Sequence, residues 1–420
     1  MPAQYFTFLF VGLLVVTLLL RFWLTSRQIR HVLAHRQAVP SQFAERIPLS
    51  AHQKAADYTV AKTKFVLLTM LVNTVVLIGF TLLGGLNWLA HLMREIAGAG
   101  MLYQLALIAA FAAISALIEL PFDYYRHFKL EQRFGFNKMT QRLFFADMVK
   151  SVLLGVAMGL PLLWIVLLLM EKSGALWWFY AWLVWSGFQL LMLVLFPTVI
   201  APMFNKFTPL ADDALRLRIE ALMKRVGFAS KGLFVMDGSK RSAHGNAYFS
   251  GFGAAKRIVF FDTLLARLAP EEVEAVLAHE LGHFKLRHII KRIVVLFSIS
   301  LGFLALLGWL KTQTWFYTGL GVEPMLDASN DAMALILFML VLPVFTFLLS
   351  PLNSLTSRKH EFEADAFAAQ HSSANKLVSA LVKLYEDNAA TLTPDPVHSA
   401  FYDSHPPATI RINRLLEQAA

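Results

Sequence analysis

Seven long apolar runs limit what this chain of 420 residues can fold into. Each run approaches the length of about 20 mostly apolar residues that a helix needs to cross a bilayer. The runs lie at 5–24, 65–85, 102–120, 151–170, 176–198, 292–311 and 332–350. Hydrophobic residues make up 57% of the chain and charged residues 16%, whereas a soluble domain has about 45–50% and 25%. The sequence therefore predicts a mainly α-helical, polytopic membrane protein with about seven transmembrane helices.

The charges between the runs predict an orientation. Lys and Arg crowd the stretches 26–64 and 121–150, whereas the short connections on the other side hold few of them. Because cytoplasmic loops carry the excess of basic residues, we expect both stretches to be cytoplasmic and the N-terminus to lie outside. Seven spans then place 199–290 and the C-terminal part 351–420 together in the cytoplasm. A metal ligand in one part would share its compartment with ligands in the other.

The net charge of +10 comes from 38 Lys and Arg against 28 Asp and Glu. Most of this excess flanks the apolar runs, where it sets orientation and meets anionic lipid. We therefore expect membrane lipid as a partner and no nucleic acid. The chain has no Cys, which excludes disulfides, thiolate zinc sites and a cysteine nucleophile.

The runs divide the chain into four parts. These are helices 1–5 in 1–198, a soluble insertion in 199–290, helices 6 and 7 in 291–350, and a C-terminal part in 351–420. Within the insertion, a helix capped by Asp212 or Asp213 is followed by three short β-type runs at 232–237, 246–253 and 257–262. A further helix starts at Pro270, so we expect an α+β domain of the zincin kind. The edge of its small sheet could hold an extended peptide by its backbone.

The segment from 278 to 283, Ala-His-Glu-Leu-Gly-His, has the spacing H-E-x-x-H. On a helix, residues four apart share a face with Cβ atoms about 5–6 Å apart, so His279 and His283 can bind one metal ion. Glu280 can reach a water molecule beside that ion. This spacing is typical of zinc peptidases, in which the metal assists hydrolysis of a peptide bond.

Two further features of this helix carry predictions. Gly282 costs about 1 kcal/mol in a helix interior relative to Ala, which suggests that another backbone or a substrate approaches closely there. The apolar pattern also suggests that the helix continues without a break through Lys291 and Arg292 into the sixth span.

A catalytic zinc ion takes three protein ligands and a water, so one more ligand is needed. The helical segment 357–366, Ser-Arg-Lys-His-Glu-Phe-Glu-Ala-Asp-Ala, follows the seventh run. Glu361 would complete a set of two His and one Glu, and Asp365 could accept the free ring N–H of a ligand His. His360 and Glu363 are rivals for the third ligand, and a solvated charged helix is the plain alternative.

A His held by prolines lies near the C-terminus. Asp-Ser-His-Pro-Pro at 403–407 precedes Arg411, and the prolines keep the chain stiffly extended. His405 and Arg411 could therefore stabilise an oxyanion, although a capped loop explains the pattern equally well. His288 lies nearer the predicted metal site, but no spacing distinguishes it.

Six segments spread along nearly the whole chain carry a family resemblance: YYRHFKLEQRFGFNKMT, FPTVIAPMFNKFTPL, GSKRSAHGNAYFSGFGAAKRIVFFDTLL, VLAHELGHFKLRH, SRKHEFEADAFA and SHPPATIRI. With these segments the chain resembles the type I CAAX prenyl endopeptidases, integral-membrane zinc metalloproteases of the a-factor-convertase kind. These enzymes trim C-terminal tripeptides from prenylated proteins.

The resemblance implies seven tilted helices around a large intramembrane chamber that the zinc domain closes on one side. It implies one zinc ion per chain and a peptide or protein substrate, prenylated or not. The implied residues are His279, His283 and Glu361 as zinc ligands, Glu280 as general base, Asp365 behind a ligand His, His405 as a substrate or transition-state contact, Arg411 as its ordering partner, and Asn246, Ala247, Tyr248 and Phe249 as the substrate-binding edge strand.

Two questions stay open at this point. The chain ends soon after Arg411 without a long retention tail, which fits a bacterial-type member in the inner (plasma) membrane better than a eukaryotic one in the endoplasmic reticulum. Two other functions also fit parts of the pattern. One is a membrane quality-control zinc protease of the heat-shock type with fewer spans. The other is a transporter or channel with a structural zinc site, although few ionisable residues lie inside the spans.

Overall fold

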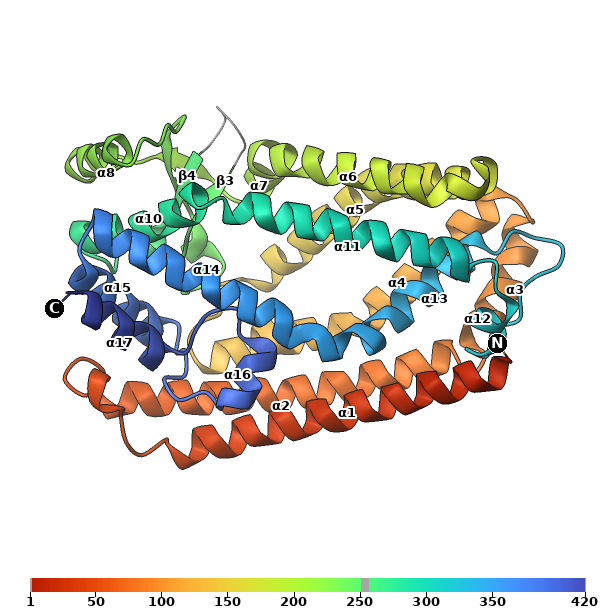
Figure 1. Ribbon diagram of the computed structural model, residues 1–420, viewed down its shortest axis with the longest axis horizontal. Helices are drawn as coiled ribbons and strands as arrows, with labels where there is room; N and C mark the ends of the chain where they lie inside the picture. The colour runs from red at the N-terminus through yellow and green to blue at the C-terminus, as the bar shows by residue number, and fades with distance from the viewer. Residues whose placement is uncertain (1, 251–256, 420) are drawn as a thin grey trace.

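A computed structural model of the chain describes residues 2–250 and 257–419 (Figure 1). Within these residues, seven helical segments are long and apolar enough to cross a membrane, as predicted. Their main helices are α1 (Ala3–Ala34), α2 (Leu49–Phe80), α4 (Met101–Tyr125), α5 (Gln141–Lys172), α6 (Trp177–Leu195), α11 (His288–Leu310) and α13 (Asp331–Thr346). The π-helical turns η2 (Arg126–Glu131) and η4 (Phe196–Ile200) extend α4 and α6.

These helices expose many large apolar side chains. Large side chains such as Val75, Leu117 and Leu153 are exposed, as expected for surfaces that meet lipid instead of water. Helix α1 packs against α2 on one side of the bundle, α6 packs against α11 on the other, and α4 and α13 lie between them (Figure 1). Two smaller helices, α3 (Gly85–Ala97) and α12 (Thr314–Thr318), lie at one end of the bundle.

The bundle has an apolar core at the end where α3 and α12 lie, and a polar cavity lies elsewhere among its helices. Its apolar core includes the fully buried Phe10, Leu107 and Leu337. A cavity of 440 Å³ lies among α1, α2, α4 and α13, and its lining includes the ionisable Arg21 and Glu119. Ionisable groups at this depth are expected only where they face a cavity or a partner. The larger chamber stays a prediction.

The insertion contains a four-stranded sheet in the order β1-β2-β4-β3. The strands are β1 (Phe207–Pro209), β2 (Leu233–Met236), β3 (Ala247–Ser250) and β4 (Arg257–Phe261). Among the described strand pairs, β2–β4 is parallel and the other two are antiparallel, and β3 lies at an edge of the sheet. The three predicted runs contain β2, β3 and β4, although positions 251–253 of the second run lie outside the described residues. Strand β1 was not predicted, because it has three residues and ends in Pro.

Helices cover this sheet and bury a second core. Helix α8 (Asp213–Arg225) starts at Asp212, whose side chain accepts a hydrogen bond from the Leu215 N–H at 2.9 Å, an N-cap that the sequence indicated. The sheet, α8 and α10 (Pro270–Lys285) enclose buried apolar residues such as Ile219, Phe260 and Leu277. Helices α15 (Ala374–Asp387) and α17 (Ala408–Ala419) pack on the same core.

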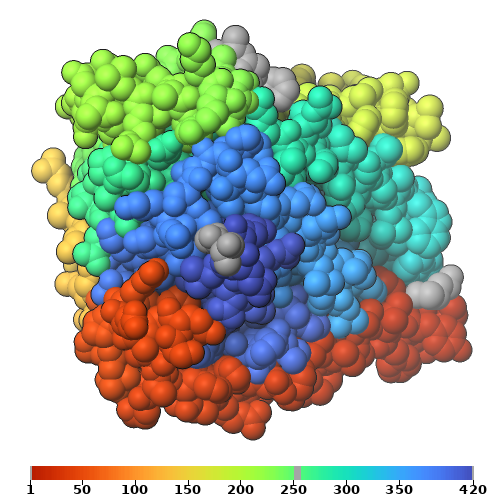
Figure 2. Space-filling model, turned by 60° about the vertical axis from the view of Figure 1, so that its left-hand side comes forward, coloured from red at the N-terminus to blue at the C-terminus, as the bar shows by residue number. Residues whose placement is uncertain are grey.

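The remaining short elements connect these parts: α7 (Ala201–Phe204), α9 (Asp262–Leu265), α16 (Pro396–Tyr402), η1 (Ser41–Phe43), η3 (Gly174–Leu176), η5 (Gly238–Lys240) and η7 (Phe347–Leu349). Through η7, α13 continues into α14 (Ser350–His371). On the face shown in Figure 2, the C-terminal helices (blue) lie between the N-terminal helices (red to orange) and the insertion (green).

The expectation that the H-E-x-x-H helix runs unbroken into the sixth span is wrong. Helix α10 ends at Lys285, and α11 starts at His288. Between them, Arg287 adopts a left-handed backbone with φ of 57°. Because residues other than Gly rarely occupy that region, the apolar pattern alone gave no sign of the break.

Candidate metal centre

Two helices cross at Gly282 with their backbones in close contact. A Cβ atom on Gly282 would lie 3.0 Å from the Cα of Ala364 and 3.1 Å from the Cβ of Phe367. The predicted close backbone approach at Gly282 is therefore confirmed, and the approaching helix is α14. A side chain at this position would push α10 and α14 apart.

This crossing brings His279 and His283 of α10 to Glu361 of α14. The two Nε2 atoms lie 3.2 Å apart. Nε2 of His279 lies 3.4 Å from Oε2 of Glu361, and Nε2 of His283 lies 3.3 Å from Oε1. These ligand atoms all lie within 4.8 Å of one another, so one ion could touch all three side chains.

The chemistry of the group fits a divalent metal. Two imidazole nitrogens and a carboxylate are the donors that a catalytic zinc ion takes from a protein. Glu361 is buried, and its Oε2 has no hydrogen-bond partner among the residues that the structure describes. A buried carboxylate oxygen without a partner is costly. A metal ion at this point would remove that cost.

Asp365 and Arg411 stand behind His279. Oδ1 of Asp365 lies 2.8 Å from Nδ1 of His279, so the carboxylate can accept the Nδ1–H and leave Nε2 free. Arg411 donates to both oxygens of Asp365, from Nε at 2.6 Å and from Nη2 at 2.7 Å. Although burial acts to lower the pKa of Arg411, the Asp365 carboxylate raises it, so the guanidinium stays charged. The structure therefore places Asp365 next to a His of the H-E-x-x-H motif.

His283 has a different support, which sequence reasoning missed. Its Nδ1 lies 3.0 Å from Nδ1 of His288, and Nε2 of His288 lies 2.8 Å from Oε2 of Glu363. On one straight helix, residues five apart would point about 140° away from each other. The break at Arg287 turns His288 back toward His283, and no spacing in the sequence could have indicated this.

The rival ligands Glu363 and His360 belong to this second arrangement. His288, His360 and Glu363 offer ligand atoms within 4.8 Å of one another. However, the His288 and His360 rings stack face to face, with centroids 4.0 Å apart and 13° between their planes. Their in-plane lone pairs therefore do not converge on one ion. Glu363 acts here as the partner of His288.

A small cavity of 110 Å³ adjoins the group of His279, His283 and Glu361. Seven residues that the sequence singled out line this cavity: Asn246, Ala247, His279, Glu280, Glu361, His405 and Arg411. Burial raises the pKa of Glu280 above its ordinary value, while the His279 and His283 rings lower it. Nε2 of His405 lies 3.6 Å from Oε2 of Glu361, and its side chain is exposed. The cavity therefore combines an acid–base group and cationic side chains with a strand edge.

Other predicted positions lie elsewhere. Tyr248 and Phe249, the second half of the predicted substrate strand, line a separate pocket beside α11.

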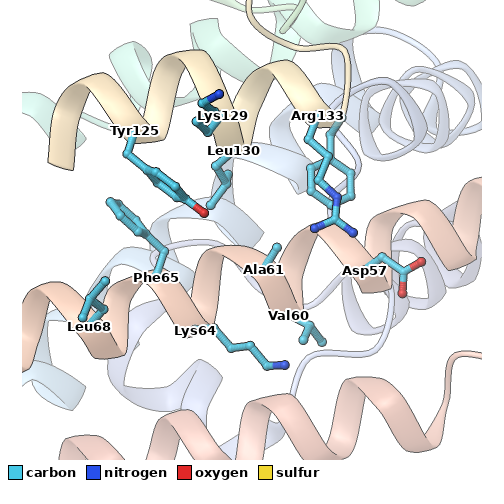
Figure 3. A pocket seen from close by; sticks show the side chains of 11 residues that line it. Asp57, Val60, Ala61, Lys64, Phe65, Leu68, Tyr125, Lys129, Leu130 and Arg133 are labelled. Carbon is cyan, nitrogen blue, oxygen red and sulfur yellow. The ribbon is translucent and has the colours of Figure 1, made fainter. Parts of the chain in front are cut away.

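A hollow of 570 Å³ between α2 and η2 is lined by Lys64, Lys129 and Arg133 beside apolar side chains (Figure 3). The Lys64 and Lys129 side chains extend in different directions in Figure 3, so these cations do not converge on one point.

Two family models cover almost all of the chain. Residues 28–206 match the model described as CAAX prenyl protease N-terminal, five membrane helices. Residues 209–419 match the model of peptidase family M48. The chain belongs to peptidase family M48. The resemblance seen in the six sequence segments is thereby confirmed, and this M48 chain is a multi-pass membrane metallopeptidase that acts on peptides or proteins.

Relatives of this M48 peptidase agree over most of its length. It is 39% identical over 332 residues to CAAX prenyl protease 1 of Saccharomyces cerevisiae, covering 74% of this chain and 72% of that one. It is 36% identical over 412 residues to the Dictyostelium discoideum homolog, covering 95% and 94%. The crystal structure of S. mikatae Ste24p superposes with a TM-score of 0.90 at 31% identity and covers 99% of both chains. These matches do not favour the transporter or the heat-shock type of protease.

Proposed function

We propose that this M48 peptidase is a zinc metalloendopeptidase that removes C-terminal tripeptides from prenylated proteins, with one zinc ion per chain. The observation that carries the proposal is the convergence of His279, His283 and Glu361 beside Glu280 in one cavity. The names of the relatives support the substrate class, because they are called CAAX prenyl proteases. Removing the tripeptide cuts the bond that directly follows the prenylated cysteine.

His279, His283 and Glu361 would hold the ion. When bound there, zinc polarises the scissile carbonyl and brings the pKa of a bound water to about 7. Glu280, whose carboxyl has a raised pKa, takes the proton of the attacking water and gives it to the leaving amine. Asp365 and Arg411 keep the His279 ring in the tautomer that leaves Nε2 free.

The remaining site residues bind the substrate in this proposal. His405 approaches Glu361 and donates to the oxygen that becomes negative in the transition state. Among the described residues, strand β3 pairs only with β4 and has no strand on its other side, so an extended peptide can add to it through backbone hydrogen bonds. Asn246 and Ala247, at the start of this strand, line the cavity that holds Glu280.

We further propose that the metal centre faces the cytoplasm and that the N-terminus lies outside. The basic connections after α1 and α4 lie at the same end of the molecule as the sheet and α15 (Figure 1). The absence of Cys makes a direct test simple. In cells, an impermeant thiol reagent should label a Lys172→Cys variant and not a Gln37→Cys variant. Labelling of the Gln37→Cys variant alone would reverse the orientation.

A cleavage assay tests the catalytic proposal. The purified protein should contain about one zinc per chain and should cleave a farnesylated CAAX peptide faster than the same peptide without the lipid. Glu280→Gln should retain zinc and lose about 10²–10⁴-fold in kcat, because the proton acceptor is gone. Glu271→Gln, on the same helix but away from the cavity, is the matched control and should cleave at the wild-type rate.

Two outcomes would contradict parts of this proposal. Wild-type turnover by Glu280→Gln would remove Glu280 from the mechanism. Equal cleavage of lipidated and unlipidated peptides would leave a metallopeptidase without prenyl specificity.

A further inference from the structure

A large apolar pocket lies where α6, α11, β3 and the end of α10 meet. It has a volume of 910 Å³, within the ~300–1,000 Å³ that is usual for ligand pockets. Polar groups in its lining come from Gln189, Tyr248, Lys285 and Arg287. Most of the rest is apolar, including Met192, Leu193, Phe249, Phe284, Ile293 and Phe297. This composition suits a hydrocarbon ligand better than a peptide side chain.

The same two elements line this pocket and the metal cavity. On β3, Ala247 faces the metal cavity, whereas Tyr248 and Phe249 line the apolar pocket. A strand rises about 3.3 Å per residue, so the two pockets lie within ~7 Å along this strand. On α10, Glu280 lines the first pocket and Phe284 the second, about one helical turn later. A substrate extended along β3 therefore meets both pockets.

The proposed reaction needs an apolar pocket next to the cavity that holds Glu280. The cysteine that carries the lipid also carries the scissile carbonyl, so its lipid chain must leave the main chain within a few bonds of the reacting carbon. The metal cavity of 110 Å³ cannot take this chain, since one water alone occupies about 30 Å³ of liquid. The apolar pocket begins one strand step away and has several times that volume.

We infer that this pocket holds the isoprenyl chain of the substrate cysteine during cleavage, an inference that rests on the proposed function. The pocket also opens on the surface of α11, an apolar helix long enough to cross a membrane, since its lining residues Ile289, Ile290 and Leu296 on that helix are exposed. The isoprenyl chain can therefore pass from the bilayer into the pocket without crossing water. An acyl chain of a bilayer lipid is the competing occupant.

Filling the pocket should remove the advantage of the lipidated substrate. Two peptides are compared, one with an S-farnesyl and one with an S-methyl cysteine. In Ile293→Trp and Met192→Trp, the ratio of kcat/KM for farnesyl over methyl should fall at least tenfold. Val295→Trp and Leu191→Trp are matched controls on the same two helices, at exposed positions that do not line the pocket, and should keep the wild-type ratio. An unchanged ratio in both pocket variants would overturn the inference.

A second measurement uses the wild-type protein and does not depend on how the variants fold. A farnesyl analogue with a photoreactive end group, attached to the peptide cysteine, should crosslink to the segments that line the pocket, 189–197, 248–249 and 284–297. Unlabelled farnesylated peptide should compete with this crosslinking. Crosslinks that map only to other segments, or crosslinks in the pocket that excess phospholipid displaces and the peptide does not, would contradict the inference and assign the pocket to bilayer lipid.

These results separate the two proposals. If the wild-type protein cleaves neither peptide, the proposed function fails. If it prefers the farnesylated peptide and the pocket variants keep that preference, only the pocket assignment fails.

Discussion

His279 and His283 stand side by side with very different supports. The support of His279 is a buried ion pair, in which Arg411 holds Asp365 against the ring. The support of His283 is a chain of hydrogen bonds through His288 to Glu363, a carboxylate that is about one-third exposed. In the proposed metal centre, buried charge supports one imidazole and a hydrogen-bond relay that ends near solvent supports the other. Removing the support of His279 should therefore lower zinc affinity more than removing the support of His283.

The largest effect is expected from Asp365→Asn. This change removes the charge that orients His279 and leaves the Arg411 guanidinium buried without its partner. Loss of such support typically costs about 10–100-fold in metal affinity, and breaking a buried ion pair costs about 3–5 kcal/mol of stability. Chelator competition measures the zinc affinity, and chemical denaturation measures the free energy of unfolding. A zinc affinity within twofold of wild type would mean that Arg411 and Asp365 only support packing.

The pH dependence of metal binding provides a second test of the support of His279. Burial and Arg411 act to lower the pKa of His279, but Asp365 and Glu361 raise it to about 9 in the metal-free protein. Because this folded pKa lies above the ordinary value of about 6.5, His279 stabilises the metal-free fold fully below pH 6.5. That stabilisation is lost as the pH rises through about 9.

Metal must displace the proton on His279. Zinc affinity should therefore rise up to tenfold per pH unit between pH 7 and about 9 from this residue alone. Calorimetry at pH 7 in buffers of different ionisation enthalpy should show release of about one proton. Zero proton release would show that His279 is already neutral.

A smaller effect is expected on the His283 side. His288→Ala should weaken zinc binding by about tenfold, the lower end of the range for such partners, because His283 loses the acceptor that fixes its tautomer. His288→Asn offers an oxygen acceptor at a similar place and should recover part of the affinity. His360→Phe, which preserves the stacked ring, is the control and should leave zinc content unchanged. Loss of a second zinc equivalent in His360→Phe would instead identify His288, His360 and Glu363 as a metal site.

The smallest effect is expected from Glu363→Gln. The amide oxygen can still accept from Nε2 of His288, and the carboxylate is partly solvated. Zinc affinity should change by less than about threefold, since hydrogen bonds near solvent contribute little. A loss equal to that of Asp365→Asn would remove the distinction between the two supports.

The sequence predicted what depends on local spacing. The apolar runs gave the seven candidate spans, and the four-residue step from His279 to His283 gave one helical face. Gly282 gave the close approach of a second helix. The pair Asp212 and Asp213 predicted the start of α8, and Asp212 is the cap. Each of these depends on neighbours within a turn or on the length of a run, which a sequence records directly.

The features that the sequence could not predict depend on how helices and strands are placed relative to one another. His288 was given no role, because the left-handed Arg287 that turns it toward His283 leaves no pattern in composition. Strand β1 was missed, because its pairing with β2 rather than its own residues defines it. The roles of Glu280, Glu361, His405 and Arg411 stay predictions, although the fold brings these residues into one cavity.

The crossing of α10 and α14 at Gly282 has a consequence for biosynthesis. A ribosome completes the H-E-x-x-H helix some eighty residues before it reaches Glu361, and it adds Arg411 later still. The nascent chain therefore contains His279 and His283 before it contains Glu361, the carboxylate that would complete the proposed metal site. With Glu361 as the proposed third ligand, peptidase activity would arise only after the last span has been translated, and an incomplete chain would be inactive.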